Sequence, residues 1–100
     1  MPKIKNWSKA EQVKKRYNRD IKRGRGKGNI TKIHYAWEKD DSPNHRVLVG
    51  TFGRGGQYRV MVDRVTGRGR KRETIETVWY DKDKAREVAV EWMRNNPRGL

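Results

Sequence analysis

The sequence QYRVMVDRV at 57–65 decides the fold, because its residues alternate in character along its whole length. Tyr58, Val60 and Val62 fall on one side of an extended chain. Alternation with a period of two predicts a β-strand with one buried face. The residues that face the other way are Arg59, Met61 and Asp63.

Turns rich in glycine and arginine stand at both ends of this strand, FGRGGQY at 52–58 and TGRGRKR at 66–72. Beyond them, RVLVGTF at 46–52 and ETIETVWY at 73–80 have the composition of further strands, and ITKIHYAWE at 30–38 predicts another. Short links join each strand to the next, and this favours an antiparallel meander.

The segment DKDKAREVAVEWMRNNP at 81–97 predicts a helix that starts at Asp81 or Asp83 and stops before Pro97. Its apolar residues recur at helical spacing and form one face that would close the core. They are Ala85, Val88, Ala89, Trp92 and Met93. The predicted fold is therefore α+β, an antiparallel meander of three to four strands packed on one C-terminal helix.

Residues 1–29 are expected to form a basic N-terminal helix or arm with a glycine-rich hinge, and residues 30–97 the sheet-plus-helix domain. Ser8 and Glu11 have the spacing of a capping box. The helix would bury only a thin stripe, so we expect it to be marginal and to gain order on a partner. The stripe consists of Ala10, Val13, Tyr17 and Ile21.

The positive charge of the chain is concentrated in two segments. There are 26 Lys and Arg against 12 Asp and Glu, a formal net charge of +14. Residues 1–28 hold eleven basic and two acidic side chains, and residues 53–72 hold seven and one. The rest of the chain is nearly balanced. Fields of this kind favour polyanions, of which nucleic acid is the commonest.

Catalysis is not indicated, and we expect neither an enzyme nor a cofactor or metal. The chain has no Cys and only two histidines, on different predicted elements. The carboxylates Glu38, Asp40 and Asp41 could hold Mg²⁺ in a nuclease, but the pattern is also that of a solvated turn. No apolar run is long enough for a membrane span, and the N-terminal MPKIKNWSK lacks the apolar core of a signal peptide. A cytoplasmic, nucleoid-associated protein is expected.

Nucleic-acid binding is the hypothesis that the charge pattern favours. Arginine presents a planar fork suited to phosphate and to guanine, and flanking glycines let the backbone approach the sugar–phosphate chain. Arg46 and Arg59 are expected on an open face of the sheet, between the two Gly-Arg turns. The full set of candidate contact residues is Lys14, Lys15, Arg19, Lys22, Arg23, Arg25, Lys27, Arg46, Arg54, Arg59, Arg68, Arg70, Lys71 and Arg72.

Duplex DNA is preferred over RNA as the partner. Tyr35, Trp37 and Tyr58 fall on the buried side of their strands, whereas exposed aromatic residues would favour single strands or RNA. Binding is expected to be largely electrostatic and weakly sequence-specific. The rival hypotheses are an RNA-binding or ribosome-associated protein, a metal-dependent nuclease, and an adaptor for an acidic protein.

The order of elements over residues 46–95 resembles the three-stranded-sheet-plus-helix DNA-binding domains, such as the plant ethylene-response-factor domain and the arm-binding domains of phage integrases. The resemblance rests on GQYRVMVDR, the basic turn after it and YDKDKAREVAVEW. It implies a sheet in the major groove, with Arg46, Arg59 and Asp63 toward DNA. The strand at 30–38 and the basic arm depart from that pattern. The segments KNWS and WMRNNPRG also look like small basic proteins of archaea and their viruses.

Overall fold

The computed structural model describes residues 4–24, 30–53 and 56–99. Its strands form one antiparallel sheet in the order β1-β2-β3-β4-β5, so consecutive strands of the chain are neighbours in the sheet. This confirms the predicted meander, which has five strands instead of three or four. The elements in chain order are β1 (Trp7–Lys9), α1 (Glu11–Lys22), β2 (Ile30–Lys39), β3 (Ser42–Phe52), β4 (Gln57–Thr66), β5 (Gly69–Trp79) and α2 (Lys82–Asn95).

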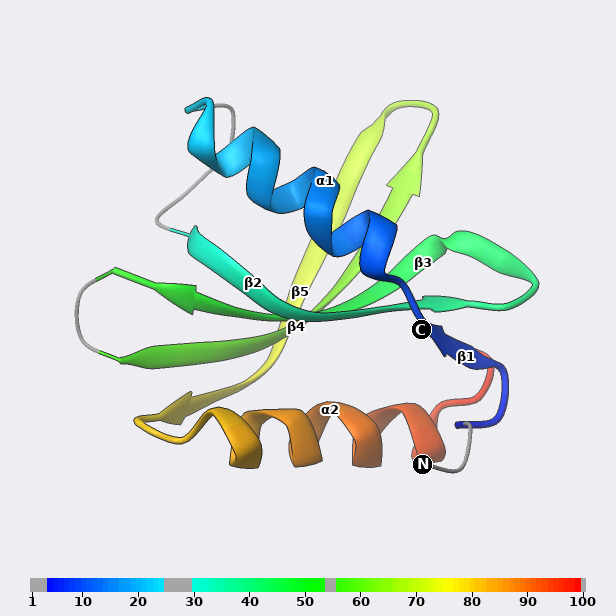
Figure 1. Cartoon of the computed structure of the whole chain (residues 1–100). Coiled ribbons are helices and arrows are strands. Elements are labelled where there is room, and N and C mark those ends of the chain that lie inside the picture. Colours follow the sequence, from blue (N-terminus) through cyan, green and yellow to red (C-terminus); the bar gives the residue numbers. More distant parts are fainter. Residues whose placement is uncertain (1–3, 25–29, 54–55, 100) are drawn as a thin grey trace.

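The molecule has three layers, because a helix covers each face of the sheet. Figure 1 shows α1 on one side of the strands and α2 on the other. The C-terminal helix was predicted to close the core, and α2 does so. The expectation of an open opposite face was wrong, since α1 lies across it and packs on β2.

On the α2 side, valines of the two central strands form the core with small residues of the helix. Val47, Val49, Val60 and Val62 pack against a helix face that includes Met93. All five side chains are at most 1% exposed. Tyr58 also joins this cluster, which confirms the side predicted for it, Val60 and Val62.

On the α1 side, a smaller core lies beneath the thin apolar stripe predicted for the N-terminal helix. Val13 and Tyr17 pack against Ile33, Leu48 and Met61. The narrow stripe is sufficient because the sheet presents large apolar side chains to it, so that α1 needs to supply few of its own. The charged residues of the helix remain outside.

A bulge in β2 allows this strand to contribute to both cores. The sequence predicts that Ile33, Tyr35 and Trp37 share one side, but the pairing register shifts between Ile33 and Tyr35. Ile33 therefore faces α1, whereas Tyr35 and Trp37 face α2. An extra residue in one strand changes the side on which all later residues fall.

The N-terminal end of α1 differs from the prediction. Ser8 lies in β1, where its hydroxyl donates to Asp40, so it forms no capping box with Glu11. The helix is preceded by Ala10, which makes no side-chain cap but donates its backbone N–H to Ala36 of β2. Pairing of β1 with β2 thus fixes where α1 starts.

Asp81 caps α2, as one of the two predicted positions, by accepting a hydrogen bond from the backbone N–H of Lys84 at 2.9 Å. We expect Asp81→Ala to lower the free energy of unfolding by about 1 kcal/mol, because this N–H then has no intrahelical partner. Urea denaturation measures the change. Asp83→Ala, two residues further along the chain, is the control. An equal loss of stability in both variants would contradict the assignment of Asp81 as the cap.

Candidate nucleic-acid interface

The far end of the β4–β5 hairpin carries a dense group of positive side chains. Residues 64–72, here called the basic hairpin, contain five basic and no acidic residues. Figure 1 shows this end of the hairpin rising on the side of the sheet that α1 occupies. Arg64, Arg68, Arg70 and Lys71 are exposed. The hairpin therefore extends the positive surface of the helix.

The outer surface of α1 is the second positive element. The helix contains five basic and two acidic residues. Asn18 exchanges hydrogen bonds with the backbone N–H and C=O of Ile33, so one flank of the helix faces β2. At about 100° per residue, Arg16 lies on the opposite flank, together with Asp20. The exposed top of α1 is lined by Lys15, Arg19 and Lys22.

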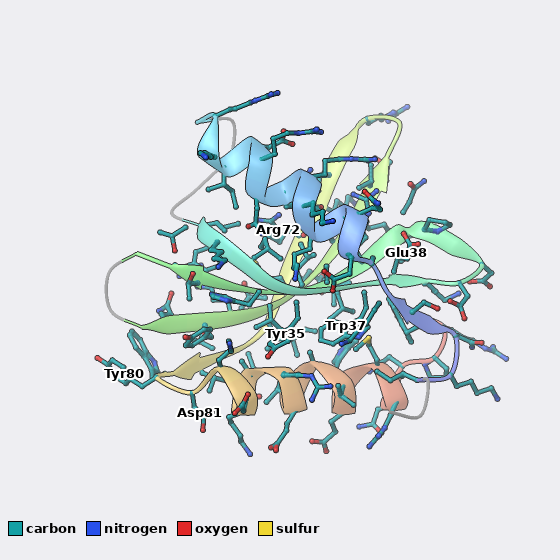
Figure 2. All side chains as sticks on the ribbon, in the orientation of Figure 1. Tyr35, Trp37, Glu38, Arg72, Tyr80 and Asp81 are labelled. Atoms are coloured by element: carbon teal, nitrogen blue, oxygen red, sulfur yellow. The ribbon has the colours of Figure 1, made fainter. Side chains whose placement is uncertain are left out.

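A buried polar network joins the helix to the hairpin. Asp63 of β4 is fully buried and accepts a 2.8 Å hydrogen bond from the Tyr17 hydroxyl of α1. Arg72 of β5 donates to both oxygens of the same carboxylate, from Nε at 2.6 Å and from Nη2 at 2.8 Å. Figure 2 shows Arg72 between α1 and the sheet. Three elements distant in sequence meet at this one carboxylate.

Two further arginines surround the network. The guanidinium of Arg70 lies 4.7 Å from the centre of the Tyr17 ring, with Nε 3.6 Å from Asp63. The guanidinium of Arg46 lies 5.9 Å from the same ring. One carboxylate is therefore approached by Arg70 and Arg72, Arg46 lies over the neighbouring Tyr17 ring, and the cluster keeps an excess of positive charge near the surface.

The network also shifts two pKa values. The hydrogen bond from Arg72 to Asp63 raises the pKa of Arg72, because it stabilises the charged form. Burial raises the pKa of Tyr17, and the nearby Asp63 charge raises it further. Both groups thus keep their protons through the neutral range.

The predicted contact residues of α1 and of its C-cap, Arg23, divide into two kinds. Lys15, Arg19, Lys22 and Arg23 are exposed. Lys14 is partly covered and forms a 3.0 Å ion pair with Glu11, so part of its charge is neutralised within the helix. The exposed four are the better candidates for contacts with a polyanion.

Arg46 and Arg59 do not project from an open sheet face, contrary to the expectation, and Arg72 is not a free residue of the turn. Arg46 and Arg72 belong to the network around Asp63. Arg59 is half-buried, lies 4.2 Å over the Phe52 ring, and donates to Gln57 Oε1 at 2.9 Å. The alternation of residues along the strands predicted the correct face of the sheet for Arg46 and Arg59, but it could not show that α1 packs on that face. Of the remaining predicted residues, Arg25, Lys27 and Arg54 lie outside the described residues.

The side of the molecule formed by α2 has a different charge. This helix contains four basic and three acidic side chains, and Asp81 precedes it. The α2 helix is therefore nearly neutral, whereas α1 and the basic hairpin, whose far end rises on the α1 side (Figure 1), hold the positive excess.

Sequence reasoning missed four exposed residues near these elements. Arg16 is exposed on α1, where helical spacing alone would have indicated it, and Arg64 is exposed at the start of the basic hairpin, paired with His45 of β3. Trp79 and Tyr80, at the end of β5, are 54% and 79% exposed, and the sequence pattern gave no prediction of their exposure. Their place at the end of a strand, next to a glycine turn, was the available signal.

Two of the three carboxylates considered for a metal site, Asp40 and Asp41, have other partners. Asp40 accepts from the Ser8 hydroxyl, and Asp41 forms an ion pair with Lys39. Within residues 4–24, 30–53 and 56–99, no three His, Cys, Asp or Glu side chains come together as a metal site would require. In the same ranges, no helix has the length and apolar character needed to cross a membrane.

Comparison with protein families, with curated proteins and with solved structures finds no match to this chain.

Proposed function

We propose that this protein binds duplex DNA through phosphate contacts made by the outer surface of α1 and by the basic hairpin. The observation that carries the proposal is the separation of charge across the sheet. The α1 side holds two positive elements joined by the Asp63 network, and the α2 side is almost neutral. A solubilising charge would not need to be gathered on one side.

The size of the molecule suits a duplex. Its principal extents are 33 × 33 × 21 Å, and one helical turn of DNA is about 34 Å long. A basic side of this length could contact phosphates along one turn. Lysines and arginines at an exposed hairpin tip and on one helix suit phosphate contacts, which carry no sequence information. Weak sequence specificity and a nucleoid location are part of the proposal.

The salt dependence of binding tests the electrostatic mechanism. If about six phosphates are neutralised, the logarithm of the affinity for a duplex should fall against the logarithm of salt concentration with a slope of about −5, because bound counterions are released. Fluorescence anisotropy with a labelled duplex at several salt concentrations measures the slope. A slope near zero would reject the mechanism.

Structured RNA is the competing polyanion. Competition of a bound labelled duplex with unlabelled duplex DNA, single-stranded DNA and a folded RNA of equal charge distinguishes them. We expect duplex DNA to compete best. If the folded RNA displaces the labelled duplex at a lower concentration than duplex DNA does, the protein binds RNA in preference to DNA.

A further inference from the structure

Two large aromatic side chains stand exposed at the end of β5. Within the described ranges of the chain, Trp79 and Tyr80 are the exposed large hydrophobic residues, and their ring centres are 6.0 Å apart at 41°. Figure 2 shows Tyr80 pointing away from the body of the protein, at the opposite end of β5 from the basic hairpin. Two adjacent exposed aromatic side chains are typical of a binding site.

The local backbone holds Tyr80 in this position. Tyr80 has φ 59°, which is uncommon for a residue other than glycine, and its N–H donates to Gly56 O at 2.9 Å. A Cβ on Gly56 would lie 2.7 Å from Tyr80 Cδ1, so the ring occupies the space that glycine leaves. The orientation of the ring is therefore built into the β3–β4 turn and is not a result of chain fraying.

A positive and a polar side chain lie beside the rings. Trp79 is paired with Gln57 across β4 and β5, and Arg59 is two residues along β4 from Gln57, on the same face of the sheet. Arg59 is held by its hydrogen bond to Gln57 and by the Phe52 ring. We call Gln57, Arg59, Trp79 and Tyr80 the aromatic patch.

We propose that the aromatic patch stacks on unpaired nucleobases, so that the preferred ligand is a DNA duplex that continues into a single strand. The inference rests on the proposed function. Aromatic rings bind bases without regard to sequence, because every base has a face on which a ring can stack. Interior base pairs of a duplex are stacked on both faces and offer none to such rings, so the aromatic patch adds little to binding along a continuous duplex.

The separation of the two surfaces suits such a ligand. The basic hairpin and the aromatic patch lie at opposite ends of β4. This strand of ten residues is about 30 Å long, and nine base pairs rise about 30 Å. Phosphates of the double-stranded part would contact α1 and the basic hairpin, and the first unpaired bases would reach Trp79 and Tyr80.

The test compares three DNA molecules that share one duplex sequence: a blunt duplex, the duplex with a six-nucleotide single-stranded tail, and the duplex with an abasic tail of equal length. Tails of both polarities are made. For at least one polarity, we expect the tail with bases to bind about tenfold more tightly than the blunt duplex. The abasic tail should add little, because it keeps the phosphates but has nothing to stack.

The variant W79A/Y80A should remove the gain from the tail while leaving the affinity for the blunt duplex unchanged. The variant W79F/Y80F, which keeps aromatic rings, should retain most of the gain. Tryptophan fluorescence gives a second measurement with the unaltered chain. Trp7 and Trp37 are at most 3% exposed, Trp92 is partly buried and Trp79 is 54% exposed, so a base stacked on Trp79 should quench the emission of the most exposed tryptophan.

The outcomes separate the two proposals. No binding of the blunt duplex would reject the proposed function. Binding of the blunt duplex with no gain from either tail, or an equal gain from the abasic tail, would overturn base stacking alone. Concentration-dependent dimerisation in sedimentation that W79A/Y80A abolishes would also overturn it, and would assign the aromatic patch to contact with a second copy of the chain.

Discussion

Asp63→Ala should lower the free energy of unfolding by about 3–5 kcal/mol, because it removes the carboxylate that compensates a largely buried arginine. Asp63 is fully buried, and the Arg72 side chain is 23% exposed. The change also leaves the Tyr17 hydroxyl without its acceptor. Since a small domain has only about 5–15 kcal/mol of stability, the variant should be close to unfolding. Urea denaturation followed by circular dichroism measures the loss.

Two further variants separate the contributions within this network. Tyr17→Phe keeps the ring beneath Arg70 and removes one hydrogen bond, and should cost about 1 kcal/mol. The double variant D63L/R72M replaces both charged groups by apolar side chains of similar volume, and should be less destabilised than Asp63→Ala. A loss for Asp63→Ala no larger than that for Tyr17→Phe would contradict the role given to the ion pair.

Removing three charges from the basic hairpin should weaken binding of a blunt duplex by about 10²–10³-fold at low salt, since each lost phosphate contact weakens binding by several-fold. The variant R64A/R68A/K71A changes exposed residues and leaves the Asp63 network intact. The slope of the salt dependence should become shallower by about three. Anisotropy titrations at several salt concentrations measure both quantities.

The matched control removes the same number of charges from the other side of the molecule. Lys82, Lys84 and Arg94 are exposed on α2, so K82A/K84A/R94A has the same net charge as the hairpin variant. We expect it to change affinity by less than about threefold, because its charges lie opposite the proposed interface. Equal losses in the two triple variants would show that the total charge of the protein, and not the α1 side, governs binding.

The strands and the C-terminal helix could be predicted because their patterns depend on local spacing. Tyr58, Val60 and Val62 alternate along β4 as a strand buried on one side requires, and Ala85, Ala89 and Met93 recur along α2 as a buried helix face requires. β1 was missed, since a strand of three residues has too few positions for a period to be visible. The bulge in β2 was missed for a related reason, because it interrupts the alternation at a single point.

The candidate interface was only partly predictable. The sequence showed which segments are basic, and the exposed residues Lys15, Arg19, Arg68 and Lys71 were identified from it. It could not show that Arg72 is engaged with Asp63, because the two are separated along the chain and meet only when β5 pairs with β4. The sequence shows where charged residues occur, but the contacts between strands and helices decide which of those side chains remain free to bind a polyanion.

The sequence by itself determined the order of the main elements, the side of β4 that faces the C-terminal helix, a helix cap at Asp81 or Asp83, and the concentration of positive charge in two segments. These follow from the spacing and type of residues that are close together in the chain. Only the tertiary structure decided that α1 covers the second face, that the two positive segments lie on one side, and that Trp79 and Tyr80 remain exposed. Those features depend on packing between residues far apart in sequence, where burial of apolar area and pairing of buried charge outweigh local pattern.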